Sequence, residues 1–263
     1  MGARVAIRRS RAALYSRRFG AVALPVLALG AVGHRIGVVD TDTLLVVILV
    51  GFLLATAAFA AGIYALADIW HSGAQGVGHA FAGLIYAAPA LVLLALSLYA
   101  TAAYPRLADI STDWDDPLRF SAAEDLAPSE DLGAYAAAQN AAYPDVTARL
   151  YAIDAEQVFA VAEELVAERG WRVAASFPPE AAGDGGLIEA EARTPIFGFA
   201  DDVLVRVQGL PEGTRVDVRS RSRIGEHDLS TNARRIRAFL NDLDAALAGV
   251  LNPSGGAGAP AAD

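Results

Sequence analysis

The first 104 residues contain a long stretch that is almost free of charge. The charged side chains between residues 19 and 104 are Arg35, Asp40, Asp42 and Asp68. A membrane-spanning helix needs about 20 consecutive apolar residues to cross a hydrocarbon core about 30 Å thick. The stretch is long enough for several such helices. The sequence therefore predicts an apolar N-terminal part that lies in lipid and a polar C-terminal part that lies in water.

About three segments are predicted to span the membrane. Residues 44–67 and 80–103 are each free of charge and long enough to cross. The first segment, residues 19–39, is weaker, because only 15 apolar residues precede His34 and Pro25 lies among them. A cleaved signal peptide is the alternative, since a basic region before a short apolar run is typical of one. We favour a retained span, because two further spans follow.

The N-terminal tail, residues 1–18, is rich in arginine. Its basic residues are Arg4, Arg8, Arg9, Arg11, Arg17 and Arg18. Basic residues beside membrane spans usually stay on the cytoplasmic side, which predicts a cytoplasmic tail. Three crossings would then place the C-terminal domain in the periplasm of a bacterium, with the protein in the inner membrane. If only two segments cross, the domain is cytoplasmic.

Composition excludes several classes of function. The chain has no cysteine, which excludes disulfides, thiolate metal sites and thiol catalysis. The formal net charge of -9 argues against nucleic acid as a partner, because duplex binding needs a concentrated basic face. We found no signature of a catalytic site, a cofactor or a metal centre, and the oligomeric state is not indicated.

The C-terminal part is predicted to be a small α+β domain. Residues 105–150 are acidic and rich in turn-forming residues, so we expect an extended linker arm there. Within residues 151–251 we expect a helix after Asp154, then strands over residues 171–177, 187–192, 202–207 and 215–223, and a last helix from Asp228 or Ser230. This order predicts an antiparallel four-stranded sheet with two helices packed on one face. Residues 252–263 are expected to be disordered.

An arginine-rich face of this sheet is the predicted binding surface. Side chains alternate along a strand, so Arg215, Asp217, Arg219, Arg221 and Arg223 share one side of the last strand. The candidate ligand-binding residues are Arg206, Arg219, Arg221, Arg223, Asp113, Asp202 and Asn232. Converging guanidinium groups suit a carboxylate, a phosphate, a lipid headgroup or an acidic envelope protein. The alternative is that these arginines pair across strands with aspartates.

Two other functions stay open. A membrane-bound metal-dependent hydrolase would use acidic residues or histidine, and the candidates are Asp113, Asp201, Asp202 and His227. A small transport or channel subunit would use the spans themselves. No motif in the sequence supports either.

The sequence resembles a bacterial family known as domain of unknown function 1499. The resemblance rests on LADISTDWDDP at 107–117, FGFADDVLVRV at 197–207, and the specific run VDVRSRSRIG at 216–225, within a region from about Leu107 to Leu243. It implies a recurring domain that is often tied to membranes, and it brings no settled activity and no catalytic residues.

Overall fold

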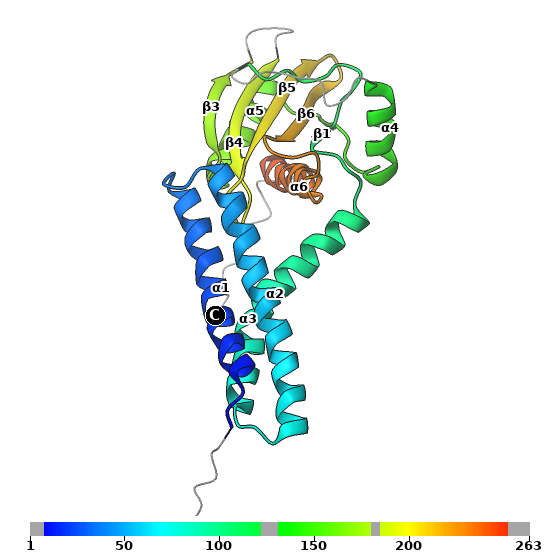
Figure 1. Ribbon diagram of the computed structural model, residues 1–263. Coiled ribbons are helices and arrows are strands. Elements are labelled where there is room, and N and C mark those ends of the chain that lie inside the picture. The colour runs from blue at the N-terminus through cyan, green and yellow to red at the C-terminus, as the bar shows by residue number, and fades with distance from the viewer. Residues whose placement is uncertain (1–7, 122–130, 180–184, 252–263) are drawn as a thin grey trace, which may run out of the picture. The chain divides into compact units, whose positions relative to one another are not determined.

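The computed structural model describes residues 8–121, 131–179 and 185–251 (Figure 1). It contains two compact units: the first comprises Met1–Ala102 with Pro195–Gly198, and the second comprises Ala103–Thr194 with Phe199–Asp263. We describe each unit by itself. The first seven residues of the arginine-rich tail and the predicted disordered end, residues 252–263, lie outside the described residues.

The first unit consists of three long helices, α1 (Arg11–Arg35), α2 (Thr41–Ser72) and α3 (Val77–Ala103). Within the described residues, each of the three is long and apolar enough to cross a membrane. The predicted apolar segments are therefore confirmed as helices. The first helix gains its length at its N-terminal end, because α1 stops at Arg35 instead of continuing to residue 39.

Small residues let these helices approach one another closely. A Cβ atom added to Gly20 would lie 2.7 Å from the carbonyl oxygen of Gly83, and one added to Gly51 would lie 2.5 Å from the side chain of Leu27. The buried hydroxyl of Ser16 donates a hydrogen bond to the carbonyl of Ala58 at 2.8 Å. Close backbone approach and interhelical hydrogen bonds are what hold helices together in lipid, where burial of apolar surface supplies little driving force.

The second unit is an antiparallel sheet with helices. Its strands are β1 (Asp109–Ser111), β2 (Arg149–Tyr151), β3 (Arg172–Phe177), β4 (Gly186–Arg193), β5 (Ala200–Leu210) and β6 (Gly213–Ser222). Its helices are α4 (Leu132–Ala142), α5 (Ala155–Glu168) and α6 (Thr231–Leu251). The strand order is β1-β6-β5-β4-β3, and β2 also pairs with β6 (Figure 1).

The core of this unit lies between the sheet and the two helices α5 and α6. The valines of β5 and β6 alternate onto one face, where Val205 pairs with Val218 and both are buried. This face packs against Val158 of α5 and Phe239 of α6, which belong to the same hydrophobic cluster. The expectation of two helices on one face of an antiparallel sheet is confirmed.

The expected number of strands was wrong, because the sheet has six strands and not four. The two additional strands, β1 and β2, have three residues each, which is too short for an alternating pattern to be recognised in a sequence. Both lie at the ends of the segment 105–150, for which we expected an extended arm. In its described part, this segment also forms α4.

A glutamine of α4 holds the edge strand β1 in place. The side-chain amide of Gln139 accepts a hydrogen bond from the backbone N–H of Ser111 at 3.1 Å and donates one to the carbonyl of the same residue at 2.7 Å. Gln139 is 1% exposed. Its amide therefore continues the hydrogen-bond ladder of the sheet beyond β1, as a further strand would.

The start of α6 has an unusual backbone. Leu229 and Ser230 have φ angles of 53° and 65°, a region that residues other than glycine rarely adopt. The carboxylate of the buried Asp228 holds this turn by accepting hydrogen bonds from the N–H groups of Ser230 at 2.8 Å and Asn232 at 2.6 Å. These bonds satisfy backbone donors that the first turn of a helix leaves without a partner.

Candidate functional site

The predicted arginine face exists, and it is the face of the sheet opposite α5 and α6. Asp202 pairs with Arg221 across β5 and β6, and Arg206 pairs with Asp217 four residue pairs further along. We call the side chains on this side of β4, β5 and β6 the arginine face. These side chains share one face of the sheet, as the alternation predicts, but most of the arginines are paired with carboxylates.

Arg219, at the centre of the arginine face, is buried. Its Nε and Nη2 atoms donate to the two carboxylate oxygens of Asp109 at 3.0 and 2.7 Å, and Nη1 donates to the carbonyl of Leu118. The guanidinium also lies over the rings of Trp114 and Phe120. Such a bidentate, fully enclosed pair leaves no room for a ligand at this residue.

A second ion-paired group contains two of the other candidates. Arg206 donates to Asp113 at 3.3 Å, to Asp217 at 3.2 Å and to Asp116 at 2.6 Å. Arg215 donates to the same Asp113 at 2.6 Å. The arginines do not repel one another, because carboxylates lie between them. Arg206 and Arg215 thus pair with aspartates, which is the alternative to an open binding surface.

The segment after β1 covers this part of the arginine face. Leu118 and Phe120 pack on Leu204 of β5 and form a small hydrophobic cluster of their own. Leu204 is fully buried for this reason, although alternation places it on the polar side. The arginine face is therefore a second buried side of the sheet at this point, and the predicted binding surface is covered here.

Asn232 was wrongly grouped with the arginine face. Its side chain lies on the helix side of the sheet, where its Oδ1 accepts a hydrogen bond from Ser220 at 2.8 Å. Arg235 bonds the same oxygen and also pairs with Asp201. Burial raises the pKa of Asp201, and the nearby Arg235 opposes that rise. We call these four side chains the Asp201 cluster, a buried structural network between β5, β6 and α6.

The acidic residues considered for a metal site do not meet. Asp202 belongs to the arginine face and Asp113 contacts that face from the segment after β1, whereas Asp201 points to the helix side. His227 accepts a hydrogen bond from the backbone of Leu229 at 3.0 Å through its Nδ1. No group of three or more histidine, aspartate or glutamate residues within the described parts of the chain could hold a metal ion.

An open part of the arginine face remains, over β3, β4 and the ends of β5 and β6. A pocket of about 240 Å³ lies there, which we call the Glu191 pocket. It is lined by Arg172, Val173, Ala174, Glu189, Ala190, Glu191, Asp202 and Arg223. The register of β3 against β4 shifts between Val173 and Ala175, beside the pocket.

Three arginines converge on one buried carboxylate in this pocket. Glu191 is 5% exposed, accepts hydrogen bonds from Arg172 at 2.7 Å and Arg223 at 2.8 Å, and forms an ion pair with Arg193 at 3.2 Å. Burial alone would raise the pKa of Glu191, but the three guanidinium groups outweigh it and the pKa is lowered. Glu191 is therefore ionised at neutral pH and fixes the positions of the arginines around it.

Asp202 and Glu189 complete the floor of the pocket. Asp202 accepts from Arg223 at 2.6 Å and from Arg221 at 3.3 Å. Glu189 accepts from the backbone N–H and the hydroxyl of Ser121 at 3.0 and 2.6 Å. The pocket thus combines rigidly held carboxylates below with exposed guanidinium groups at its rim.

Sequence reasoning found Arg223 and Asp202 but missed Arg172, Arg193 and Glu191. The alternation of β4 does place Glu189 and Glu191 on one side, which was the available signal. Which arginines face them depends on the register between β3 and β4. Register is a property of strand pairing and could not be derived from the separate strand patterns.

Comparison with known proteins gives one assignment. No curated protein and no solved structure matches the chain. A family model described as "Protein of unknown function (DUF1499)" matches residues 109–243, just over half of the 263-residue chain. This match begins at β1 and ends within α6, so it covers every strand of the sheet described above. The chain belongs to the DUF1499 family.

Proposed function

We propose that this protein is a membrane-anchored binding protein that takes a small anion into the Glu191 pocket. The convergence of three guanidinium groups on one buried carboxylate carries the proposal. Two arginines, 172 and 223, line the pocket, and two more, 193 and 221, pair with its carboxylates from outside the lining, so four guanidinium groups stand against the three carboxylates of Glu189, Glu191 and Asp202. The group therefore has an excess of positive charge that an anion would balance.

Two of these arginines, Arg172 in the lining and Arg193 beside it, keep donors available for a ligand, and we call them the rim arginines. Arg172 and Arg193 each pair with Glu191 through a single nitrogen, and their side chains are 74% and 41% exposed. A guanidinium has five N–H donors in a planar fork that matches carboxylate and phosphate oxygens. Glu191 holds both forks at the pocket, so little ordering is needed on binding. A volume of about 240 Å³ favours a small ligand such as phosphate or a short dicarboxylate.

Replacing both rim arginines tests this function. We expect the double variant Arg172→Gln, Arg193→Gln to lose affinity for inorganic phosphate or succinate by at least about tenfold, since hydrogen bonds to charged groups contribute about 1.5–3 kcal/mol. Isothermal titration of the full chain in detergent measures the affinity. Arg223 is left in place, because it also pairs with Asp202 and its loss would disturb the sheet.

A matched control separates the pocket from the overall charge. Arg106→Gln with Arg234→Gln removes two charges from positions that neither line the pocket nor pair with its carboxylates. The control variant is expected to bind like the parent. Equal losses in both double variants, or a parent that binds neither anion, would contradict the proposal.

The three apolar helices support a placement of the protein in a bacterial inner membrane. Arg11, Arg17 and Arg18 lie at the N-terminal end of α1, and positive residues favour the cytoplasmic side. Three crossings then put the sheet domain in the periplasm. The hydrolase alternative gains no support from the separated aspartates.

Reporter fusions test this topology. An enzyme that is active only in the periplasm should be active when fused after residue 251 and inactive when inserted in the connection at residues 73–76 between α2 and α3. The opposite pair of activities would mean that the tail is periplasmic or that α1 does not span. Activity at neither site, with both fusions expressed, would mean that α3 does not span.

A further inference from the structure

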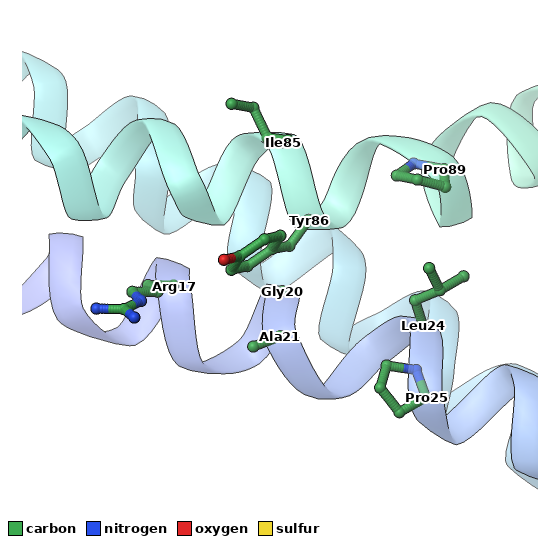
Figure 2. Close-up of a pocket in the computed structure, with 8 residues that line it drawn as sticks. All are labelled: Arg17, Gly20, Ala21, Leu24, Pro25, Ile85, Tyr86 and Pro89. Carbon is green, nitrogen blue, oxygen red and sulfur yellow. The ribbon is translucent and has the colours of Figure 1, made fainter.

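A groove lies between α1 and α3 in the first unit (Figure 2). Its volume is about 480 Å³. It is lined by Arg17, Gly20, Ala21, Leu24 and Pro25 of α1 and by Ile85, Tyr86 and Pro89 of α3. All of these residues except Arg17 and the hydroxyl of Tyr86 present apolar atoms. The groove is thus apolar, with the cationic side chain of Arg17 in its lining.

Small residues and prolines shape the groove. Gly20 lets α1 approach α3 closely, because a Cβ there would lie 2.7 Å from the carbonyl oxygen of Gly83, and Ala21 beside it leaves space that a larger side chain would fill. Pro25 and Pro89 cannot donate the helical hydrogen bond to the residue four positions earlier. Those residues are Ala21 and Ile85, which both line the groove. The walls therefore include backbone as well as side chains.

Arg17 has no ion-pair partner among the residues that the structure describes, and it is exposed. Arg8, which precedes α1, differs from Arg17 because it pairs with Asp68 at 3.2 Å. An arginine at the end of an apolar groove, with its donors unused, suits a ligand with a negative headgroup and a hydrocarbon tail.

The position of Arg17 along the bundle fits the boundary between headgroups and hydrocarbon. α2 has 32 residues and is about 48 Å long, which exceeds a hydrocarbon core of about 30 Å. Its polar residues Asp68 and His71 lie at the end that contacts the start of α1. Arg17 to Pro25 spans eight residues, or about 12 Å, which is close to the depth of one leaflet.

We propose that this groove binds one anionic phospholipid, with its phosphate at Arg17 and one acyl chain between α1 and α3. The inference rests on the membrane placement proposed above, and it adds a lipid site that is separate from the Glu191 pocket. In a bilayer, lipid chains fill an apolar groove of this size. The free cation at its end selects an anionic headgroup over a neutral one.

Lipid retention by the full chain tests the site. The protein is extracted into mixed micelles that contain equal amounts of phosphatidylglycerol and phosphatidylcholine, and the bound lipid is counted by native mass spectrometry. We expect the parent to retain phosphatidylglycerol in preference to phosphatidylcholine. Arg17→Gln should reduce that preference about fivefold, as expected for one basic residue at a membrane surface. Arg17→Lys, which keeps the charge, should retain most of it.

Two further variants decide between this site and a general surface effect. Arg18→Gln makes the same charge change one residue later, outside the groove, and should leave the preference unchanged. Ala21→Leu fills the groove and should lower retention of both lipids, with helical content by circular dichroism equal to that of the parent. Equal effects of Arg17→Gln and Arg18→Gln, no preference in the parent, or full retention by Ala21→Leu would overturn the proposal.

Failure of the lipid site and failure of the membrane placement are distinguishable. A protein that does not insert would fail to float with lipid vesicles, whatever residue stands at position 17. A protein that floats but shows no preference for phosphatidylglycerol would overturn the lipid site alone.

Discussion

Replacing Arg219 with Met is expected to lower the free energy of unfolding of the sheet domain by about 3–5 kcal/mol. Arg219 is 2% exposed and is the ion-pair partner of Asp109, which is also 2% exposed. Methionine roughly fills the space, but it removes the cation that forms the buried ion pair with this carboxylate. Urea unfolding of the full chain in detergent measures the change. Tryptophan fluorescence in a Trp70→Phe background reports on Trp114 and Trp171, which belong to the second unit.

The double variant Arg219→Met, Asp109→Leu isolates the buried charge as the cause. Replacing both members of a buried ion pair with apolar residues is often neutral, so the double variant should be more stable than Arg219→Met alone. Arg106→Met is the matched control, because Arg106 forms only an exposed pair with Glu226 and should change stability little. If the double variant lost as much free energy of unfolding as Arg219→Met and Asp109→Leu together, the unpaired buried charge would not be the cause of the loss.

Replacing Phe239 with Ala is expected to destabilise the same domain by about 3–5 kcal/mol, the usual cost of a large aromatic residue in a core. Phe239 is fully buried in α6, and its ring stacks on Trp171 at 5.7 Å between centroids. Arg169 lies over both rings. The truncation leaves a cavity between α6 and the sheet that these neighbours can fill only in part. The same urea experiment measures it.

Phe177→Ala is the matched control for Phe239→Ala. Phe177 lies at the end of β3, and it is 56% exposed. Its truncation should change the free energy of unfolding by about 0.5 kcal/mol or less, as surface substitutions usually do. If both alanine variants lost the same stability, the packing of α6 on the sheet would not be what holds this domain.

Local patterns in the sequence predicted most of the elements. The apolar stretches gave three helices, and alternation placed β3, β4, β5 and β6 close to their observed bounds. The two strands that were missed contain only three residues each, and both are held by pairing with β6. Their existence depends on a partner distant in the chain, together with Gln139 of α4 in the case of β1. A local sequence pattern cannot indicate such a distant partner.

The candidate site was predicted only in outline. Alternation identified which arginines share a face, because side-chain direction follows from the strand itself. It identified Asp202 and Asp217 as possible partners but missed two other carboxylates, Asp109 from an edge strand and Glu191 from β4. Asn232 was misplaced because it lies in the first turn of α6. The side of the sheet that a helix covers is decided by packing.

The sequence alone therefore determined the division into apolar helices and an α+β domain, since hydrophobicity and periodicity are local properties of the chain. Only the tertiary structure decided which arginines are buried in ion pairs and which remain open around Glu191. It also decided that Arg17 stands at the end of an apolar groove. The physical reason is the same in each case: a charged group acquires its role from the partners that strand register and helix packing bring within a few ångströms of it.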